Sequence, residues 1–357
     1  MPREFEPGIP ALYKYQSIKY FPFKAEPGAS YVLTSDPFSY LKTWFRQQAG
    51  TRQSPKKSRM DKGRYFVDLA EGFAVAAENA RLPTKATLVY YSLLNLVKAY
   101  LCANEIELET KPEVHGITLP SHEEEKLTIA ARTQNHISIF KEFSKSLGTP
   151  VTGKMEISFT DFMEDIPEIH ELVFSLGLIG KRKFLPVEID FLTNEKMNKL
   201  FTEIKYQKRQ EPRVSIERFD KGERKEYFKC RDTNEGGYVI YRSATRVNYT
   251  QDNLPTKYKN ICKKFRKFDL VSILTRSGYR HYINLKPGPF HHLANHLAFM
   301  FYLGTIARYR PSKAEELMTG QYRPIISECI ATSPKQFQYQ IASLITKSVC
   351  AVPMAKL

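Results

Sequence analysis

Cysteines, long apolar runs and secretion signals are scarce or missing in this 357-residue chain, and each shortage excludes a class of protein. The five cysteines are odd in number, lie far apart and form no Cys-x-x-Cys pair, which excludes a zinc ribbon and a disulfide framework. The longest apolar run, Leu297 to Ala307, reaches about half the length that a membrane helix needs. Residues 1–30 contain no secretory signal. We therefore expect a cytoplasmic protein without a membrane partner.

The motifs of common nucleotide-dependent and hydrolytic enzymes are also missing. The chain has no P-loop motif, no Gly-x-Gly-x-x-Gly after a predicted strand, no Gly-x-Ser-x-Gly and no His-Glu-x-x-His. His292 and His296 lie one helical turn apart and suit a shared metal ion, with His291 beside them. No third ligand with a familiar spacing accompanies them, so a structural or surface role is preferred. We expect neither a metal nor a cofactor.

The chain is strongly basic, and the positive charge is concentrated in one region. Lys and Arg number 54 against 38 Asp and Glu, which gives a net charge of +16, while 42% of the residues are hydrophobic and can fill a large core. Residues 205–286 alone contain 21 Lys and Arg and 9 Asp and Glu, a net charge of +12. Such a cluster is either a solvated surface or a binding site for a polyanion such as nucleic acid.

A second, smaller cluster of positive charge surrounds a Ser-Pro turn near residue 54. It is opposed within the segment only by Asp61, and its members are Arg52, Lys56, Lys57, Arg59, Lys62 and Arg64. We expect residues 49–63 to form a basic loop, and we include Lys56, Lys57 and Arg59 in a predicted nucleic-acid surface.

Hydrophobic periodicity predicts helices on both sides of a strand-rich middle region. Residues 1–35 read as an extended or irregular arm, and Ser121 with Glu124 forms a capping box that opens a helical stretch to about Gly148. The predicted helices are 37–48, 64–80, 85–103, 167–176, 257–270, 290–308, 312–331 and 335–348. The predicted strands are 183–191, 224–231, 237–246 and 279–285, with a hairpin loop at 234–237.

These elements predict an α+β fold in which a mainly helical bundle is interrupted by a basic antiparallel β insert. We assign residues 1–59 to an N-terminal arm with a short helix and a basic loop, and residues 60–180 and 287–357 to the two parts of the bundle. Residues 181–286 form the insert. The two most apolar helices, 85–103 and 290–308, are expected to pack against each other across the insert.

Helix 85–103 is apolar nearly all round except for three polar residues on one face. Tyr91, Asn95 and Lys98 follow one another at spacings of four and three residues. This face is either the less buried side of the helix or a polar seam that orients a ligand. In the second interpretation, a polar pocket contains Tyr91, Asn95, Lys98, His115, His296 and Arg308.

Several short segments of the sequence, taken together with their order along the chain, resemble the bacterial YaaC-like family. They are Tyr90 to Ala99, His115-Gly116, Gln134-Asn135, Ile166 to Ile169, and Ile306 to Tyr309. The resemblance covers roughly residues 60–345. It implies a lineage and a fold.

The helical part is also similar to HEPN domains, which have a Tyr-Tyr helix ending in Lys-Ala followed by a loop with His-Gly. That resemblance implies RNA binding or a metal-independent ribonuclease in antiphage defence or RNA control. Its Arg-x4–6-His signature is matched here by Arg276 and His281, where the imidazole would transfer protons and the guanidinium would stabilise phosphate charge.

The sequence therefore predicts nucleic-acid binding, with RNA as the favoured target. Phosphates would contact the basic residues of helix 257–270, which are Lys257, Lys259, Lys263, Lys264, Arg266 and Lys267. Two alternatives stay open. One is a HEPN-type ribonuclease, and the other is a non-catalytic scaffold whose basic insert binds an acidic protein partner.

Overall fold

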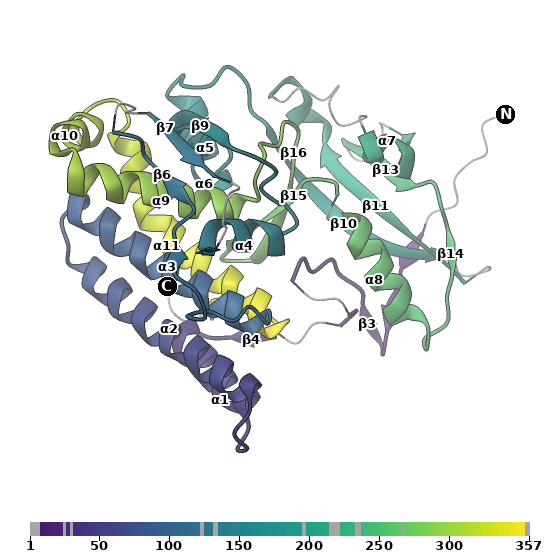
Figure 1. The fold of residues 1–357 in the computed structure, drawn as a ribbon. Helices are drawn as coiled ribbons and strands as arrows, with labels where there is room; N and C mark the ends of the chain where they lie inside the picture. Colours follow the sequence, from purple (N-terminus) through teal and green to yellow (C-terminus); the bar gives the residue numbers. More distant parts are fainter. Residues whose placement is uncertain are drawn as a thin grey trace.

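The computed structural model describes residues 8–23, 26–28, 31–121, 125–130, 135–194, 198–213, 222–232, 237–265 and 267–353. The fold is mixed α+β, with eleven α-helices among the described residues and one eight-stranded antiparallel sheet. Figure 1 shows the helices gathered on one side and the sheet on the other. This arrangement confirms the predicted fold class.

The helical body is built around one central helix. Helix α3 (Leu82–Ala103) contacts α2 (Pro55–Glu78), α9 (His292–Tyr309) and α11 (Arg323–Thr346), and these helices lie side by side in Figure 1. The predicted pairing of the two apolar helices across the insert, here α3 and α9, is therefore confirmed. Among the described residues, α3 is the one helix long and apolar enough to cross a membrane, but 72% of its apolar window is buried in the protein. The remaining helices of the body are α1 (Pro37–Ala49) and α10 (Pro311–Thr319).

The N-terminal end of α2 overturns the prediction of a basic loop over 49–63. The helix begins at Pro55, because the Ser54 side chain accepts a hydrogen bond from the Lys57 backbone and Pro55 occupies the first turn. Most of the basic residues expected in a loop are therefore on a helix. The long helix α11 similarly continues through Pro334, so the two predicted segments 312–331 and 335–348 are replaced by α10 and α11.

A second correction concerns the expected helical stretch from Ser121 to Gly148. Strand β7 (Lys126–Ile129) pairs with β6 (Ile117–Thr118) and β9 (Met155–Ser158), because its alternating pattern buries Leu127 and Ile129. Among the described residues of this stretch only α4 (Ile139–Ser146) is helical, and Glu124 of the capping box, like Gln134, lies outside the described residues. The other short elements of this region are β5 (Glu113–Val114), β8 (Ile137–Ser138), α5 (Phe159–Glu164) and α6 (Pro167–Ser175).

The predicted β insert is a curved antiparallel sheet with strand order β12-β13-β11-β10-β16-β15. Strands β11, β14 and β15 were not predicted, and residues 224–227 of the expected strand 224–231 belong to helix α7 (Gly222–Tyr227). The predicted loop at 234–237 lies outside the described residues apart from Gly237. The strands are β10 (Phe184–Asn194), β11 (Lys199–Gln207), β12 (Phe228–Asp232), β13 (Tyr238–Ser243), β14 (Val247–Asn248), β15 (Leu270–Thr275) and β16 (Gly278–Asn284).

Helix α8 (Leu254–Phe265) covers one face of the sheet and forms a core separate from that of the helical body. Its buried stripe contains Tyr258, Ile261 and Phe265, as the sequence pattern predicts. The helix begins and ends earlier than the predicted 257–270, since β15 starts at Leu270. Packing on this stripe leaves the lysines of α8 on the outer side.

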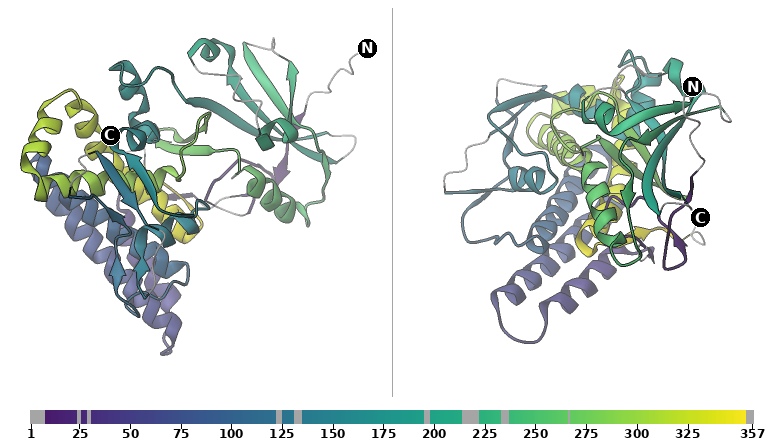
Figure 2. Two further views of the ribbon diagram at one scale, coloured as in Figure 1. Left: turned by 45° about the horizontal axis from the view of Figure 1, so that its top comes forward. Right: turned by 90° about the vertical axis from the view of Figure 1, so that its right-hand side faces the viewer.

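The N-terminal arm packs on its own chain and joins the two parts of the fold. Strand β1 (Ile9–Pro10) pairs with β10 of the sheet, and β4 (Tyr31–Leu33) pairs in parallel with β17 (Val349–Ala351) beside the helical body. Between them, the Tyr258 hydroxyl donates to the Lys19 carbonyl and accepts from the Phe21 amide. The small hairpin of the arm comprises β2 (Leu12–Tyr13) and β3 (Gln16–Ser17), and the two turned views in Figure 2 show the arm running from the sheet to the helices.

Candidate functional site

A lysine-lined cleft lies between α8 and the end of the sheet. It has a volume of about 470 Å³ and is bounded on the sheet side by residues of β11, β13 and β14, with Tyr227 at its wall. The Lys264 ammonium lies 5.1 Å from the Tyr227 ring centroid, which combines a cation with an aromatic face. Four of its lining side chains carry positive charge: Lys257, Lys263, Lys264 and Lys267. We call this cavity, with its four lysines, the α8 lysine cleft.

Part of the positive charge of the α8 lysine cleft has no carboxylate partner in the described chain. Lys257 and Lys263 have no carboxylate partner in the described residues, and neither does Lys259, which is exposed on the same helix. The nearest acidic residue of the following turn, Asp269, pairs instead with Arg224 at 3.2 Å. Arg266, which the sequence places in the same set, lies outside the described residues. Unpaired cations on a cleft wall are suited to binding an anion.

The second basic cluster differs because acidic residues pair with it, one from the same segment and others from the segment after α3. Lys57 Nζ lies 2.7 Å from Asp61, and Arg59 Nη1 lies 2.8 Å from Glu107, a residue of the segment that follows α3. Lys56 is exposed at the start of α2. The predicted contribution of this cluster to nucleic-acid binding stays a prediction, but its electrostatic attraction for a polyanion is weaker than that of the α8 lysine cleft.

Part of the predicted polar pocket assembles where α3, α9 and the loop before β6 meet. Arg308 Nη1 donates to the Tyr91 hydroxyl at 2.7 Å, and its Cζ lies 5.5 Å from the Tyr91 ring centroid. The neighbouring Tyr90 hydroxyl lies 2.6 Å from His115 Nδ1, and the two tyrosine rings are 5.4 Å apart. The pKa of His115 is lowered by burial and by the nearby charges of Arg308 and Lys98. Sequence reasoning missed Tyr90, which the apolar pattern assigned to the core.

The backbone fixes His115 in this position. The Phe140 amide donates to the His115 carbonyl at 3.1 Å, and Gly116 adopts a φ of 81°. A Cβ atom at Gly116 would lie 2.0 Å from Ser138 Oγ, so the turn tolerates only glycine. The loop therefore holds the imidazole against Tyr90.

The other predicted members of the pocket take different positions. Asn95 is buried and donates to the Tyr91 carbonyl of its own helix, and Lys98 pairs with Glu113 at 2.7 Å. His296 is fully buried elsewhere in the body, with Nε2 3.1 Å from Glu168 Oε2 of α6. Of the predicted members, the structure thus brings Arg308 and Tyr91 into contact, and His115 is joined to them through Tyr90.

The histidine cluster of α9 lies inside the protein. A carboxylate contacts it, which the spacing of the histidines in the sequence did not predict. Beside the Glu168–His296 pair, His292 Nε2 contacts Gln340 at 2.8 Å. Burial lowers the pKa of His292 to about 4. Burial by itself would raise the pKa of Glu168, but His296 and other neighbours outweigh it, so that this pKa is lowered. No group of three His, Cys, Asp or Glu side chains in the described part of the chain is arranged to hold a metal ion. The arrangement is that of a buried acid–base pair.

The two residues of the Arg-x4-His match lie on one β-hairpin. Arg276 is exposed in the turn between β15 and β16, and His281 is on β16 opposite Ser272. The His281 ring contacts Ser272 Oγ at 2.9 Å and the Tyr20 ring at a centroid distance of 5.0 Å, and burial lowers its pKa to about 4. Their role in catalysis stays a prediction, with His281 engaged in packing and Arg276 several residues along the hairpin.

A wider groove of about 1070 Å³ runs along the sheet beside the N-terminal arm. Its walls carry both signs of charge, and two of its carboxylates are internally paired: Asp190 with Lys205 at 2.6 Å, and Glu203 with Arg242 at 2.6 Å. This mixture makes the groove a poorer match to a polyanion than the α8 lysine cleft.

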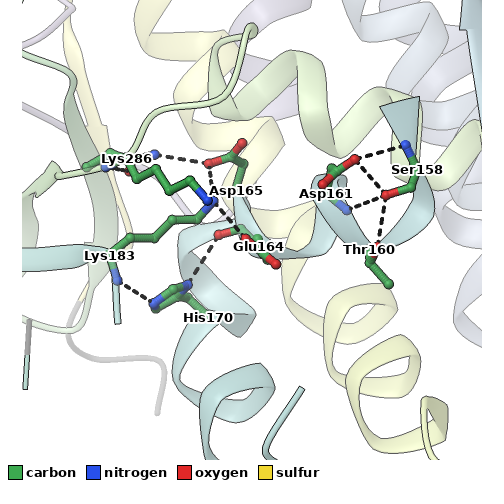
Figure 3. Close-up of polar contacts among 9 residues, drawn as sticks. Ser158, Thr160, Asp161, Glu164, Asp165, His170, Lys183 and Lys286 are labelled. Atoms are coloured by element: carbon green, nitrogen blue, oxygen red, sulfur yellow. Dashed lines mark hydrogen bonds and ion pairs between the residues drawn. The ribbon is translucent and has the colours of Figure 1, made fainter. Parts of the chain in front are cut away.

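A buried polar network connects the helical body to the sheet, as Figure 3 shows. Lys183 Nζ, at the start of the sheet, lies 2.9 Å from Asp165 Oδ1, and Asn284 of β16 donates to the same oxygen at 3.1 Å. His170 Nε2 accepts from the Lys183 amide at 3.0 Å. A side chain at Gly288 would place its Cβ 2.0 Å from Asp165 Oδ2, which explains why the connection to α9 has a glycine at this point. This network fixes the orientation of the two cores.

Comparison with protein-family models matches residues 22–345 to the model described as YaaC-like Protein. Comparison with curated proteins gives no match, and comparison with solved structures gives none either.

Proposed function

The chain belongs to the YaaC-like protein family, and for this member we propose a nucleic-acid-binding function carried by the α8 lysine cleft, with RNA as the target. The proposal includes a cytoplasmic location and a role in antiphage defence or RNA control. It rests on the sequence and the geometry of the cleft, since family membership does not specify a ligand.

One observation carries the proposal: several lysines face one cleft and lack carboxylate partners in the described chain. Lys257 and Lys263 both line the cleft, and Lys259 lies on the same helix. A lysine ammonium binds phosphate as a point charge, and each contact releases condensed counterions from the nucleic acid. Contacts of this kind position a backbone without reading bases. We therefore expect salt-sensitive binding with little dependence on sequence.

The test is a salt titration with the variant Lys263→Gln/Lys264→Gln. We expect the variant to bind single-stranded RNA roughly tenfold more weakly than the original chain at low salt, and to lower the slope of log affinity against log salt by about 1–2, because two phosphate contacts are lost. Fluorescence anisotropy with labelled RNA, DNA and heparin at several salt concentrations measures both quantities.

The matched control is Lys111→Gln/Lys126→Gln, which removes the same charge from exposed positions of the helical part. This control should retain the affinity and the slope of the original chain. Absence of binding to all three polyanions at about 50 mM salt would contradict the proposal. Equal losses in both double variants would show that net charge, rather than the cleft, attracts the ligand.

A further inference from the structure

Arg308 is an exposed guanidinium that is held rigidly on the helical body yet has no carboxylate partner in the described chain. Its Nε donates to the Gly304 carbonyl at 2.9 Å, and its Nη1 donates to the Tyr91 hydroxyl at 2.7 Å. The second terminal nitrogen remains available as a donor. A guanidinium fixed in this way is pre-organised to bind a planar or tetrahedral anion.

We propose that Arg308 and His115 form a phosphate-binding site for a nucleotide, with the exposed ring of Tyr309 as the surface on which the base stacks. The proposed ligand is a phosphate group that carries a nucleobase, supplied either by a free nucleoside monophosphate or by the phosphorylated end of a nucleic acid. This site is separate from the α8 lysine cleft and does not depend on the proposed function.

The hydrogen bond from Tyr90 determines which proton His115 offers. The Tyr90 hydroxyl is buried and keeps its proton, because burial raises its pKa. Its single contact in the described residues is His115 Nδ1, so the hydroxyl donates to that nitrogen. The imidazole then carries its proton on Nε2, where it can act as a donor. A neutral donor beside a cation is suited to bind a phosphate oxygen.

The electrostatic environment favours an anion at the same place. The two charges that act on His115 are both positive, from Arg308 and Lys98. Lys98 is compensated by Glu113 at 2.7 Å, whereas Arg308 is not compensated. A guanidinium without a carboxylate partner can therefore pair its charge with one phosphate group.

Two aromatic rings lie close to the guanidinium. Arg308 Cζ lies 5.5 Å from the Tyr91 ring centroid and 5.1 Å from that of Tyr309. Tyr309 is 72% exposed, which is unusual for an aromatic residue. Its ring lies beside the charged Arg308 side chain. A base stacked on a tyrosine contributes to binding without sequence preference. The ring and the guanidinium together match the two parts of a nucleotide.

Isothermal titration of the full chain with defined probes tests the proposal. The probes are AMP, inorganic phosphate, and one short single-stranded oligonucleotide with either a 5′-phosphate or a 5′-hydroxyl. We expect the 5′-phosphorylated form to bind more tightly than the 5′-hydroxyl form. Arg308→Gln should weaken binding of phosphorylated probes about 10- to 100-fold, since a charge-assisted hydrogen bond is lost. Tyr309→Ala should weaken AMP about tenfold but leave inorganic phosphate unchanged.

Two controls separate this site from the α8 lysine cleft. Arg81→Gln removes an exposed arginine from the same helical body and should change nothing. Lys263→Gln/Lys264→Gln should preserve AMP binding even if it abolishes binding of long RNA. Tighter binding of the phosphorylated oligonucleotide than of AMP assigns the site to nucleic-acid ends, and equal affinity assigns it to free nucleotides. The proposal is overturned if no phosphorylated probe binds at millimolar concentration, or if Arg308→Gln binds AMP as the original chain does.

Discussion

Acidification from pH 6.5 to 4 is expected to remove roughly 5 kcal/mol from the free energy of unfolding through the buried histidines His170 and His292 alone. Burial lowers the pKa of each to about 4 in the folded chain, against about 6.5 in an unfolded chain. His170 Nε2 accepts a hydrogen bond from the Lys183 amide, and a proton on that nitrogen would remove the acceptor. Both imidazoles are therefore neutral in the folded protein.

The direction of this effect follows from proton counting. Between pH 4 and 6.5 the unfolded chain binds more protons than the folded chain, so the stability that depends on the neutral histidines is complete above pH 6.5 and declines as the pH falls. Each such group adds a slope that approaches about 1.4 kcal/mol per pH unit, and His281, whose pKa burial also lowers to about 4, contributes in the same way as His170 and His292.

Urea denaturation at several pH values between 7.5 and 5 measures this slope. His170→Gln and His292→Gln should each reduce the slope by about 1.4 kcal/mol per pH unit, the share of one histidine, whatever their stability at neutral pH. His136→Gln replaces an exposed histidine and should leave the slope unchanged. A free energy of unfolding that stays constant over this range would refute the prediction.

Lys183→Met is expected to destabilise the fold by about 3–5 kcal/mol, because it leaves the Asp165 carboxylate buried without its cation. The pair is closed off from water: the Lys183 and Asp165 side chains are 9% and 8% exposed. The amide of Asn284 would remain as one donor to the carboxylate, which does not replace a charge.

The comparison variant is Lys205→Met, which breaks the Lys205–Asp190 pair at 2.6 Å on the open sheet. Solvent reaches that pair, so its loss should cost less than about 1 kcal/mol. The double variant Lys183→Met/Asp165→Leu should recover much of the lost stability. Midpoints of urea denaturation at pH 7.5 rank the variants, and similar losses for Lys183→Met and Lys205→Met would be the contradicting outcome.

The helices were predictable because their apolar residues recur at the helical period over many turns. The stripe of α8 and the apolar length of α3 and α9 each indicate a helix from local sequence alone. Strand β7 was mistaken for helix because four residues between turns carry little periodic information, and its pairing with β9 depends on residues about 30 positions away. Local patterns do not report such pairing.

The candidate sites show the same division between local and distant information. The α3 spacing predicted a polar face, and Arg308 meets Tyr91 on this helix. His296 was included on the condition that it faces the same side of α9 as Arg308, but twelve residues along a helix amount to about 18 Å, so it lies at a different depth of the bundle. Its partner Glu168 comes from α6, and no sequence spacing relates the two.

The parallel pairing of β4 with β17 has a consequence for how the protein is made. Residues 31–33 have no strand partner until residues 349–351 have left the ribosome, and α3 meets α9 only after the whole sheet has been synthesised. Translation therefore exposes the apolar faces of the early helices while the later ones are still missing. Chaperone binding during synthesis is the natural protection for such a chain.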